Sequence, residues 1–240
     1  MHPEPDILQQ LFEKASSIFS FDEAQFTIGT RYVAALNKKG QIGVCATLNT
    51  VIDNKATQYI DFTDHRSRVI ANAFINATLN YIHKIDGHGD IFDVVDFSLF
   101  KNTVMIGYFD SLVQKLQGKG IAPVVFDIDQ HEAPVMPMVK QKEYLSQAQC
   151  VILTSTSLGN KTFQGIIDAI PPSCSVYMLG PSTPIDDLMF TIPQVKGLFG
   201  SLFPLNHAET LKLIAEGCGT KGFMHNMQKV YRIQKLEVRS

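Results

Sequence analysis

Charge is scarce in this sequence of 240 residues, and neither sign predominates. The chain has 21 Lys and Arg residues against 23 Asp and Glu residues, which gives a formal net charge of -2. A protein without an excess of positive charge gains little from the counterion release that drives binding to a phosphate backbone. We therefore expect no nucleic-acid partner.

Long apolar runs and a secretion signal are also missing. No stretch approaches the roughly 18 consecutive apolar residues that a membrane-spanning helix needs. The chain begins with acidic residues and prolines, whereas a signal peptide begins with basic residues and an apolar stretch. We therefore expect a soluble, cytoplasmic protein without a membrane partner.

Cysteine is sparse. The four cysteines lie far apart, without a CxxC pair and without the density of a secreted disulfide scaffold, so reduced thiols are expected. Cys45 and Cys150 fall within apolar runs, where a thiol is usually unreactive, and the sequence has no GxSxG nucleophile elbow. Nucleophilic catalysis therefore has little support.

The chain does have enough apolar residues for a sizeable core. Hydrophobic residues make up 45% of the sequence and charged residues 18%, against the ~25% charged residues of an average protein. The composition predicts a globular protein. The length allows one large domain or two small ones.

The first hundred residues predict an α+β arrangement. Apolar residues spaced three and four apart between Ile7 and Phe19 indicate an amphipathic helix. Apolar runs on either side of the turn-forming segment Asn37–Gly40 indicate a hairpin or meander. A second helical pattern extends from Asp64, a suitable N-cap, to about His83.

After a turn-rich stretch, short β-branched runs alternate with helical segments. Continuous apolar strands separated by helices are typical of a parallel sheet that is buried on both faces and joined by right-handed crossovers. The sequence therefore predicts an α/β protein, with an α+β domain at residues 1–100 and a Rossmann-like domain at residues 101–240. The predicted strands contain Val104–Ile106, Val124–Phe126, Val151–Leu153, Val176–Leu179 and Leu198–Phe199.

The loops after these strands form the candidate site, because an open parallel sheet binds ligands outside the carboxyl ends of its strands. Two of the loops are rich in hydroxyl groups and lead into helices, whose first N–H groups can hold an anion or a small polar ligand. The alternative is that these residues are ordinary helix caps. The candidate ligand-binding residues in the loops are Gly107, Tyr108, Phe109, Asp127, Thr154, Ser155, Thr156, Ser157, Leu158, Asn160, Thr162, Gly180, Pro181, Ser182 and Thr183.

The first loop argues against an ordinary NAD site. A dinucleotide fingerprint needs three glycines spaced GxGxxG, so that the backbone can approach the pyrophosphate. Here only Gly107 is present. Tyr108 and Phe109 place large side chains in the loop, where the fingerprint requires glycines that leave the backbone accessible. Asp127 follows the second strand and fits either a ribose-like diol or a solvated strand end.

The segment Leu153–Thr162, together with Leu179–Pro184 and Gly107–Phe109, resembles the putative heavy-metal chelation family. In that family an enolase-N-terminal-like domain precedes a Rossmann-like domain. The segments Ile28–Tyr32 and Ile75–Ala77 are similar to other signatures of the family. The resemblance implies a ligand cleft between the two domains, without an established activity.

The hydroxyl-rich loop departs from the family pattern at two positions. The pattern is Thr-Gly-Ser-Thr-Leu-x-Asn-Gly-Thr, and Leu158, Asn160 and Thr162 match it identically. Ser155 and Lys161 stand where the family has glycines, so each adds a side chain where a ligand could otherwise approach the backbone.

Three asparagines recur every four residues along one face of the helix that follows Asp64. Asn72, Asn76 and Asn80 predict either a solvated face or an amide row. On the second interpretation Asn76 turns into the cleft between the domains and binds the ligand, so it joins the candidate site residues.

Metal ligands show no recognisable spacing. The one cluster of His and Asp residues matches no zinc, EF-hand or facial-triad pattern, and a solvated turn is its better interpretation. A metal ion or metal chelate stays open as a cofactor, because a metal can enter with a chelating ligand. The cluster consists of His83, His88, Asp90, Asp93 and Asp96.

The last segment of the chain is basic. Residues 221–240 carry five Lys and Arg residues against one Glu. Such a segment is usually a solvated face, and the alternative is a basic rim that attracts an anionic ligand.

Three classes of function remain. The leading hypothesis is a protein that binds a small polar or anionic molecule, or a metal chelate, between two domains. The second is an enzyme for a nucleotide-like or carboxylate substrate, in which the hydroxyl-rich loops stabilise negative charge. The third is a subunit of a homo-oligomer, with Met136, Met138 and Phe223 exposed for the interface.

Overall fold

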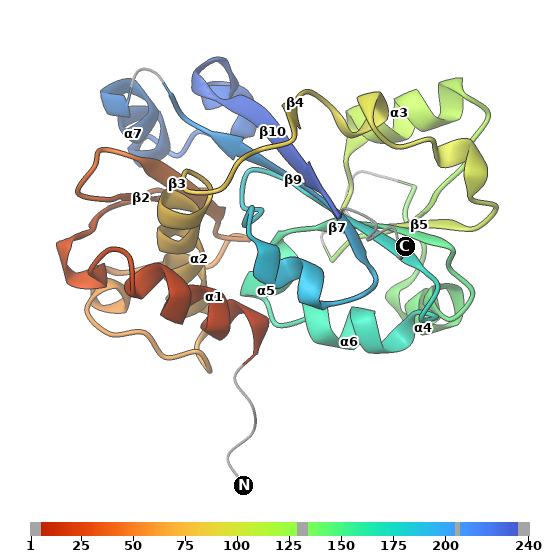
Figure 1. Ribbon diagram of the computed structural model, residues 1–240, viewed down its shortest axis with the longest axis horizontal. Coiled ribbons are helices and arrows are strands. Elements are labelled where there is room, and N and C mark those ends of the chain that lie inside the picture. Colours follow the sequence, from red (N-terminus) through yellow and green to blue (C-terminus); the bar gives the residue numbers. More distant parts are fainter. Residues whose placement is uncertain (1–5, 129–133, 205–206, 235–240) are drawn as a thin grey trace, which may run out of the picture.

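Two sheets of different kinds organise the computed structural model, which describes residues 6–128, 134–204 and 207–234. A three-stranded antiparallel sheet lies on one side of the molecule and a seven-stranded, mostly parallel sheet on the other (Figure 1). The predicted α/β fold class is therefore confirmed. Among the residues described, no helix has the length and apolar character needed to cross a bilayer.

The small sheet is a meander of β1 (Gln25–Ile28), β2 (Tyr32–Leu36) and β3 (Ile42–Ala46). The predicted turn joins β2 to β3. The Asn37 side chain accepts hydrogen bonds from the backbone N–H groups of Lys39 and Gln41, at 2.9 and 3.1 Å, and so closes the turn locally.

Helix α2 (His65–Leu79) packs on β2 and β3, and α1 (Ile7–Ser16) packs on α2. Both helices begin at an aspartate whose carboxylate accepts a backbone N–H bond, as the N-cap position favours. Helix α2 lies so close to β3 that a Cβ atom at Gly43 would stand 2.0 Å from the Ala77 nitrogen. Only glycine fits at that contact.

The large sheet has the order β4-β10-β9-β8-β7-β5-β6. The five predicted apolar runs are all strands, and they pair in parallel as expected. These parallel strands are β5 (Thr103–Ile106), β6 (Val124–Phe126), β7 (Cys150–Thr154), β8 (Ser175–Leu179) and β9 (Val195–Leu202).

Helices cover both faces of the large sheet. Val104 and Ile106 of β5 belong to a core that includes Ile166 of α6, whereas Met105 belongs to a core that includes Leu112 of α3. Alternate side chains of one strand thus enter different cores, as the pleat of a strand requires. The flanking helices are α3 (Asp110–Gly118), α4 (Gln141–Leu145), α5 (Thr156–Gly159) and α6 (Phe163–Ala169).

Short 3-10 helices occur in the connections of both parts of the molecule. They are η1 (Phe21–Glu23), η2 (Asn54–Thr57), η3 (Ile91–Asp93), η4 (Phe97–Leu99), η5 (Met138–Lys140), η6 (Asp187–Thr191) and η7 (Met224–Asn226).

Two strands of the large sheet are missing from the sequence prediction. The basic segment contains β10 (Gln228–Ile233), which pairs antiparallel with β9 and with the two-residue β4 (Gly87–His88). A wholly solvated face is therefore wrong for this segment, since Val230 is fully buried. Residues after 234 lie outside the described residues.

The chain returns to the small sheet after β9. Helices α7 (His207–Ala215) and α8 (Thr220–Phe223) follow, and α7 lies beside β2 in Figure 1. Phe223 has no exposed surface and packs edge-on against Tyr32. The expectation that Phe223 is exposed for an oligomer interface is therefore wrong, because α8 turns it into the core beneath the small sheet.

The predicted division at residue 100 stays a prediction, and hydrophobic cores extend across it. Ile91 and Phe97 belong to the same core as the large-sheet residue Met105, and Ile214 belongs to the same core as the small-sheet residue Tyr32. Gly29 lies in the loop between β1 and β2. A Cβ atom there would stand 1.9 Å from the Ile214 oxygen, so the backbone of α7 packs directly against this loop.

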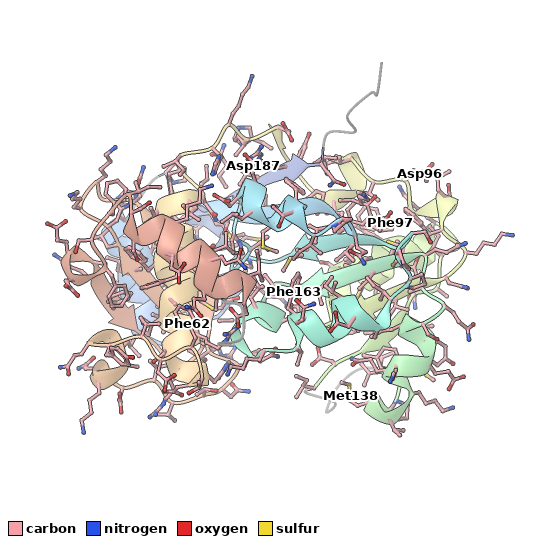
Figure 2. The ribbon with its side chains drawn as sticks, turned by 60° about the horizontal axis from the view of Figure 1, so that its bottom comes forward. Phe62, Asp96, Phe97, Met138, Phe163 and Asp187 are labelled. Atoms are coloured by element: carbon pink, nitrogen blue, oxygen red, sulfur yellow. The ribbon has the colours of Figure 1, made fainter. Side chains whose placement is uncertain are left out.

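A buried carboxylate joins the two parts of the molecule. The Asp186 side chain has no exposed surface, and its oxygens lie 2.8 Å from Lys14 Nζ and 2.6 Å from His83 Nε2. The Leu188 backbone N–H also donates to it. Its neighbour Asp187, labelled in Figure 2, is exposed and pairs with Arg232 at 2.6 Å.

We predict that Asp186→Asn lowers the free energy of unfolding by about 3 kcal/mol, because it removes one charge from a buried, hydrogen-bonded group of ions. Asp187→Asn is the matched control, with an expected loss of at most about 1 kcal/mol, since that carboxylate is 59% exposed. Urea unfolding of the two variants measures both values. Equal losses would show that Asp186 has no special part in joining the two halves.

Candidate functional site

The strand order places the site at the point where the chain changes direction across the sheet. From β5 the chain passes to β6 on one side, and then returns to β7 on the other side of β5. In such sheets the crevice for a ligand lies outside the carboxyl ends of the two strands that flank this point. Gly107 follows β5 there, and Thr154 ends β7.

A cavity of about 700 Å³, called here the large cavity, opens beside this point. Its walls come from both parts of the molecule, because Arg31 and Tyr32 of the small sheet face the loops that follow β5, β7 and β8. The segment Gly219–Gly222 at the start of α8 and Lys229 of β10 also line it. The cavity therefore has lining residues from both parts of the molecule, and the predicted ligand cleft stays a prediction.

Positive charge gathers around the large cavity. Arg31, Lys115, Lys221 and Lys229 line it, against the two carboxylates Asp90 and Asp110. Arg31 and Lys115 are distant in sequence from each other and from the neighbouring pair Lys221 and Lys229. Basic side chains thus cluster at this cavity, although the net charge of the whole chain is only -2.

Asp90 already forms ion pairs with two of these four basic residues. Its carboxylate lies 3.2 Å from Lys115 Nζ and 3.3 Å from Lys229 Nζ. Burial acts to raise the pKa of the Asp90 carboxyl, but Lys229 and Lys115 outweigh it and hold that pKa below its usual range. Among the described residues, no carboxylate lies within ion-pair distance of Arg31 or Lys221.

Residues of both hydroxyl-rich loops line the large cavity, and their joint role in ligand binding stays a prediction. Gly107 and Gly180 have φ angles of 92° and 120°, a region that favours glycine, and they turn the chain sharply after β5 and β8. The predicted residues that line this cavity are Tyr108, Phe109, Thr154, Ser155, Thr156, Gly180, Pro181 and Ser182.

A second cavity of about 380 Å³, called here the small cavity, lies on the other side of the same loops. Its predicted lining residues are Gly107, Tyr108, Phe109, Asp127, Thr154, Thr156, Asn160 and Thr162. Tyr108, Phe109, Thr154 and Thr156 line both cavities and form the wall between them.

Four predicted residues line neither cavity. Ser157 and Leu158 are buried in α5, and Thr183 is buried behind Ser182. Asn76 donates from Nδ2 to the Val44 oxygen of β3, at 2.9 Å, and so points to the small sheet. A role of Asn76 in ligand binding finds no support in this placement.

The asparagine row is buried, so its interpretation as a solvated face is wrong. Asn72, Asn76 and Asn80 are each at most 1% exposed. Asn72 donates to the Ser182 oxygen at 3.2 Å, and Asn80 donates to the Thr183 oxygen at 3.1 Å and accepts from the Ile185 N–H at 2.7 Å. The outer members of the row therefore hold the loop after β8.

Arg68 extends the same face of α2 by one turn towards its N-terminus. The guanidinium is 4% exposed and donates to the Leu158 oxygen at 2.7 Å and to the Gly159 oxygen at 3.2 Å. Asp6 supplies the neighbouring carboxylate. One polar face of α2 thus fixes the backbone of both hydroxyl-rich loops.

Both departures from the family's glycine pattern fit the backbone. Lys161 has a φ angle of 64°, so it keeps the left-handed conformation that suits the glycine of the pattern. Ser155 has an ordinary helical φ of -66°. Asp127 accepts a hydrogen bond from the Tyr108 N–H and helps to order the first loop, and its predicted diol role stays a prediction.

The donor set does not fit a metal ion held by the protein alone. Among the described residues, no group of three or more His, Cys, Asp and Glu side chains could hold one. Burial raises the pKa of the Cys45 and Cys174 thiols to about 12 and also raises that of Cys150, which keeps these thiols protonated. The predicted His and Asp cluster is dispersed, with His83 bound to Asp186 and Asp90 to lysines.

Sequence reasoning missed most of the charged lining. Arg31 lies inside the Ile28–Tyr32 signature, but nothing local marks it as facing the other sheet. The run Gly217-Cys218-Gly219-Thr220-Lys221-Gly222 is the signal that was available, because glycines so dense allow close approach of a backbone. Lys221 and Lys229 fit the alternative of a basic rim.

We predict that Asn80→Ala destabilises the protein by about 1–3 kcal/mol, because it leaves the buried Ile185 N–H and Thr183 carbonyl without their partner. On a solvated face the same change would be neutral or stabilising, since Ala is the better helix former. Thermal and urea unfolding distinguish the two signs. An unchanged or raised stability would contradict the role of the row in holding the loop.

We also predict that a single thiol reacts in the native protein. Cys218 is partly exposed and the other three cysteines are buried. At pH 8 a thiol with a pKa of about 12 is ionised in about one molecule in ten thousand, so it reacts slowly even before its access is restricted. A chromogenic disulfide reagent should titrate one thiol per chain in buffer and four in guanidinium. Fast reaction of two or more thiols in the native protein would contradict the conclusion that the buried cysteines stay protonated and do not serve as metal ligands.

The fold and sequence were compared with those of known proteins. A sequence profile of the DUF364 family, described as "Putative heavy-metal chelation", matches residues 90–233. No curated protein matches the sequence. Two crystal structures of DUF364 proteins of unknown function have the same fold. The one from Pyrococcus horikoshii has 18% sequence identity and a TM-score of 0.78, and the match covers 95% of this chain and 100% of that chain.

The second structure, from Desulfitobacterium hafniense, has 16% identity and a TM-score of 0.75, with 95% of this chain and 98% of that chain covered. At these identities the structural likeness concerns the fold alone. The profile match, in contrast, spans more than half of the chain. The chain belongs to the DUF364 family.

Proposed function

We propose that the protein binds a small anionic molecule in the large cavity. The observation that carries the proposal is the convergence of Arg31, Lys115, Lys221 and Lys229 on one cavity in a chain whose net charge is -2. Cations gathered in this way attract an anion and raise its local concentration. Carboxylates and phosphates are the anions that such side chains hold best.

The loops after β7 and β8 supply the second part of the proposal. Thr154, Ser155, Thr156, Gly180 and Ser182 line the same cavity as the four basic residues, so hydroxyl groups and cations share one site. These loops are fixed from behind by α2, whereas the four basic side chains are exposed and can adjust. The loops supply polar groups at fixed positions, and the exposed basic side chains can change rotamer. This combination suits an anion that carries several oxygens.

A metal takes part in this proposal only as part of the ligand. The family description names heavy-metal chelation, and the described side chains do not assemble a set of metal ligands. An anionic chelator would bring its own donors and present its remaining negative charge to the cations. The alternative is an enzyme that acts on such an anion in the same cavity, and turnover of the bound anion would favour it.

We predict that the protein binds pyrophosphate, used as a simple probe anion, and that Lys221→Ala and Arg31→Ala each weaken it about tenfold. Raising the salt concentration should weaken it further, because exposed cations are screened. Lys142→Ala is the matched control, since Lys142 is exposed and lines neither cavity. Isothermal titration calorimetry measures all four affinities. Binding that is equally sensitive to Lys142→Ala, or absent in the unaltered protein, would refute the proposal.

A further inference from the structure

The small cavity differs in chemistry from the large one. Its lining is mainly apolar, and Asp127 is the one charged residue among the described residues that line it. The small cavity therefore suits an uncharged group. The apolar lining residues are Leu48, Ile106, Phe109, Phe126, Met138 and Ile166, with Ile128 at the rim.

Exposed apolar side chains gather at this cavity. Leu48, Ile128 and Met138 are 43%, 68% and 37% exposed, although residues of their size are usually covered. They come from three different segments, and all three line the same cavity. Met138 lies at the edge of the molecule in Figure 2. An apolar group in the cavity would cover part of each of them.

The turn that carries Leu48 is strained. Leu48 and Asn49 have φ angles of 52° and 61°, and the Thr50 N–H donates to the Thr47 oxygen to close the turn. Two consecutive residues of this conformation are typical of Gly, Asn and Asp. Asn49 fits this preference and Leu48 does not. The turn itself thus gives no reason for a leucine, whereas contact with an apolar group in the cavity would give one.

The two cavities meet along a narrow wall. Gly107 lies beside that wall and lines the small cavity, and a Cβ atom added to it would stand 2.8 Å from the Thr154 Cβ. Thr154 and Thr156 line both cavities, and their hydroxyl oxygens lie 2.9 Å apart. A ligand that lies across this wall would place one end among the cations and the other among the apolar side chains.

From these observations we infer that the ligand is an amphipathic anion, with a carboxylate, sulfonate or phosphate in the large cavity and an uncharged apolar group in the small cavity. The inference rests on the proposed function and adds a second subsite to it. Leu48, Ile128 and Met138 hold the apolar group, and they determine which anions bind.

Anilinonaphthalene sulfonate tests the inference, because it joins an aromatic group to a single anion, and pyrophosphate serves as the probe without an apolar group. Ile128→Ser should weaken the dye about tenfold, as expected for the loss of one apolar side chain from the contact, and leave the affinity for pyrophosphate unchanged. Leu48→Gly should also weaken the dye while the melting temperature stays the same or rises, because glycine relieves the turn. Saturating pyrophosphate should displace the dye from the unaltered protein.

Val139→Ser is the matched control, since Val139 is 89% exposed beside Met138 and lines neither cavity. Equal effects of Val139→Ser and Ile128→Ser, or no effect of Ile128→Ser, would overturn the second subsite. Dye that binds without competition from pyrophosphate would overturn the claim that one ligand spans both cavities. If pyrophosphate fails to bind while Ile128→Ser still weakens the dye, the proposed function fails and the apolar subsite stands.

Discussion

The rest of the structure depends on helix α2, which is buried along almost its whole length and still carries polar side chains. Thirteen of its fifteen residues are buried. A buried donor without a partner is costly, so each polar group on the inner face requires a carbonyl or carboxylate at a fixed place. Arg68, Asn72 and Asn80 find these partners in the loops after β7 and β8. The position of helix α2 and the conformation of the two loops therefore depend on each other.

This requirement explains why the candidate site has a fixed part and an adjustable part. The loop backbone is held from behind by α2, and Ser182 is also tied to the small sheet because its hydroxyl accepts the Ala46 N–H at 3.0 Å. The cations are different, because they stand on exposed side chains from separate segments. Lys115 and Lys229 share Asp90, so an incoming anion would compete with that carboxylate for them.

Packing between the two sheets extends well beyond the site. Helix α7 returns from the large sheet to cover the small one, and Asp186 lies buried between Lys14 and His83. Contacts of this kind resist separation of the two parts, since a break would expose apolar surface and leave buried charges without partners.

The sequence by itself determined the fold class, the five parallel strands and the turn at Asn37–Gly40, because hydrophobic period and turn chemistry are local. Tertiary structure alone decided the rest. Strand β10 forms only because β9 offers it an edge, and Asn72 and Asn80 of α2 are buried only because carbonyls 110 and 103 residues away accept their protons. Polar residues read from sequence look solvated, and their partners become visible only when the chain has folded.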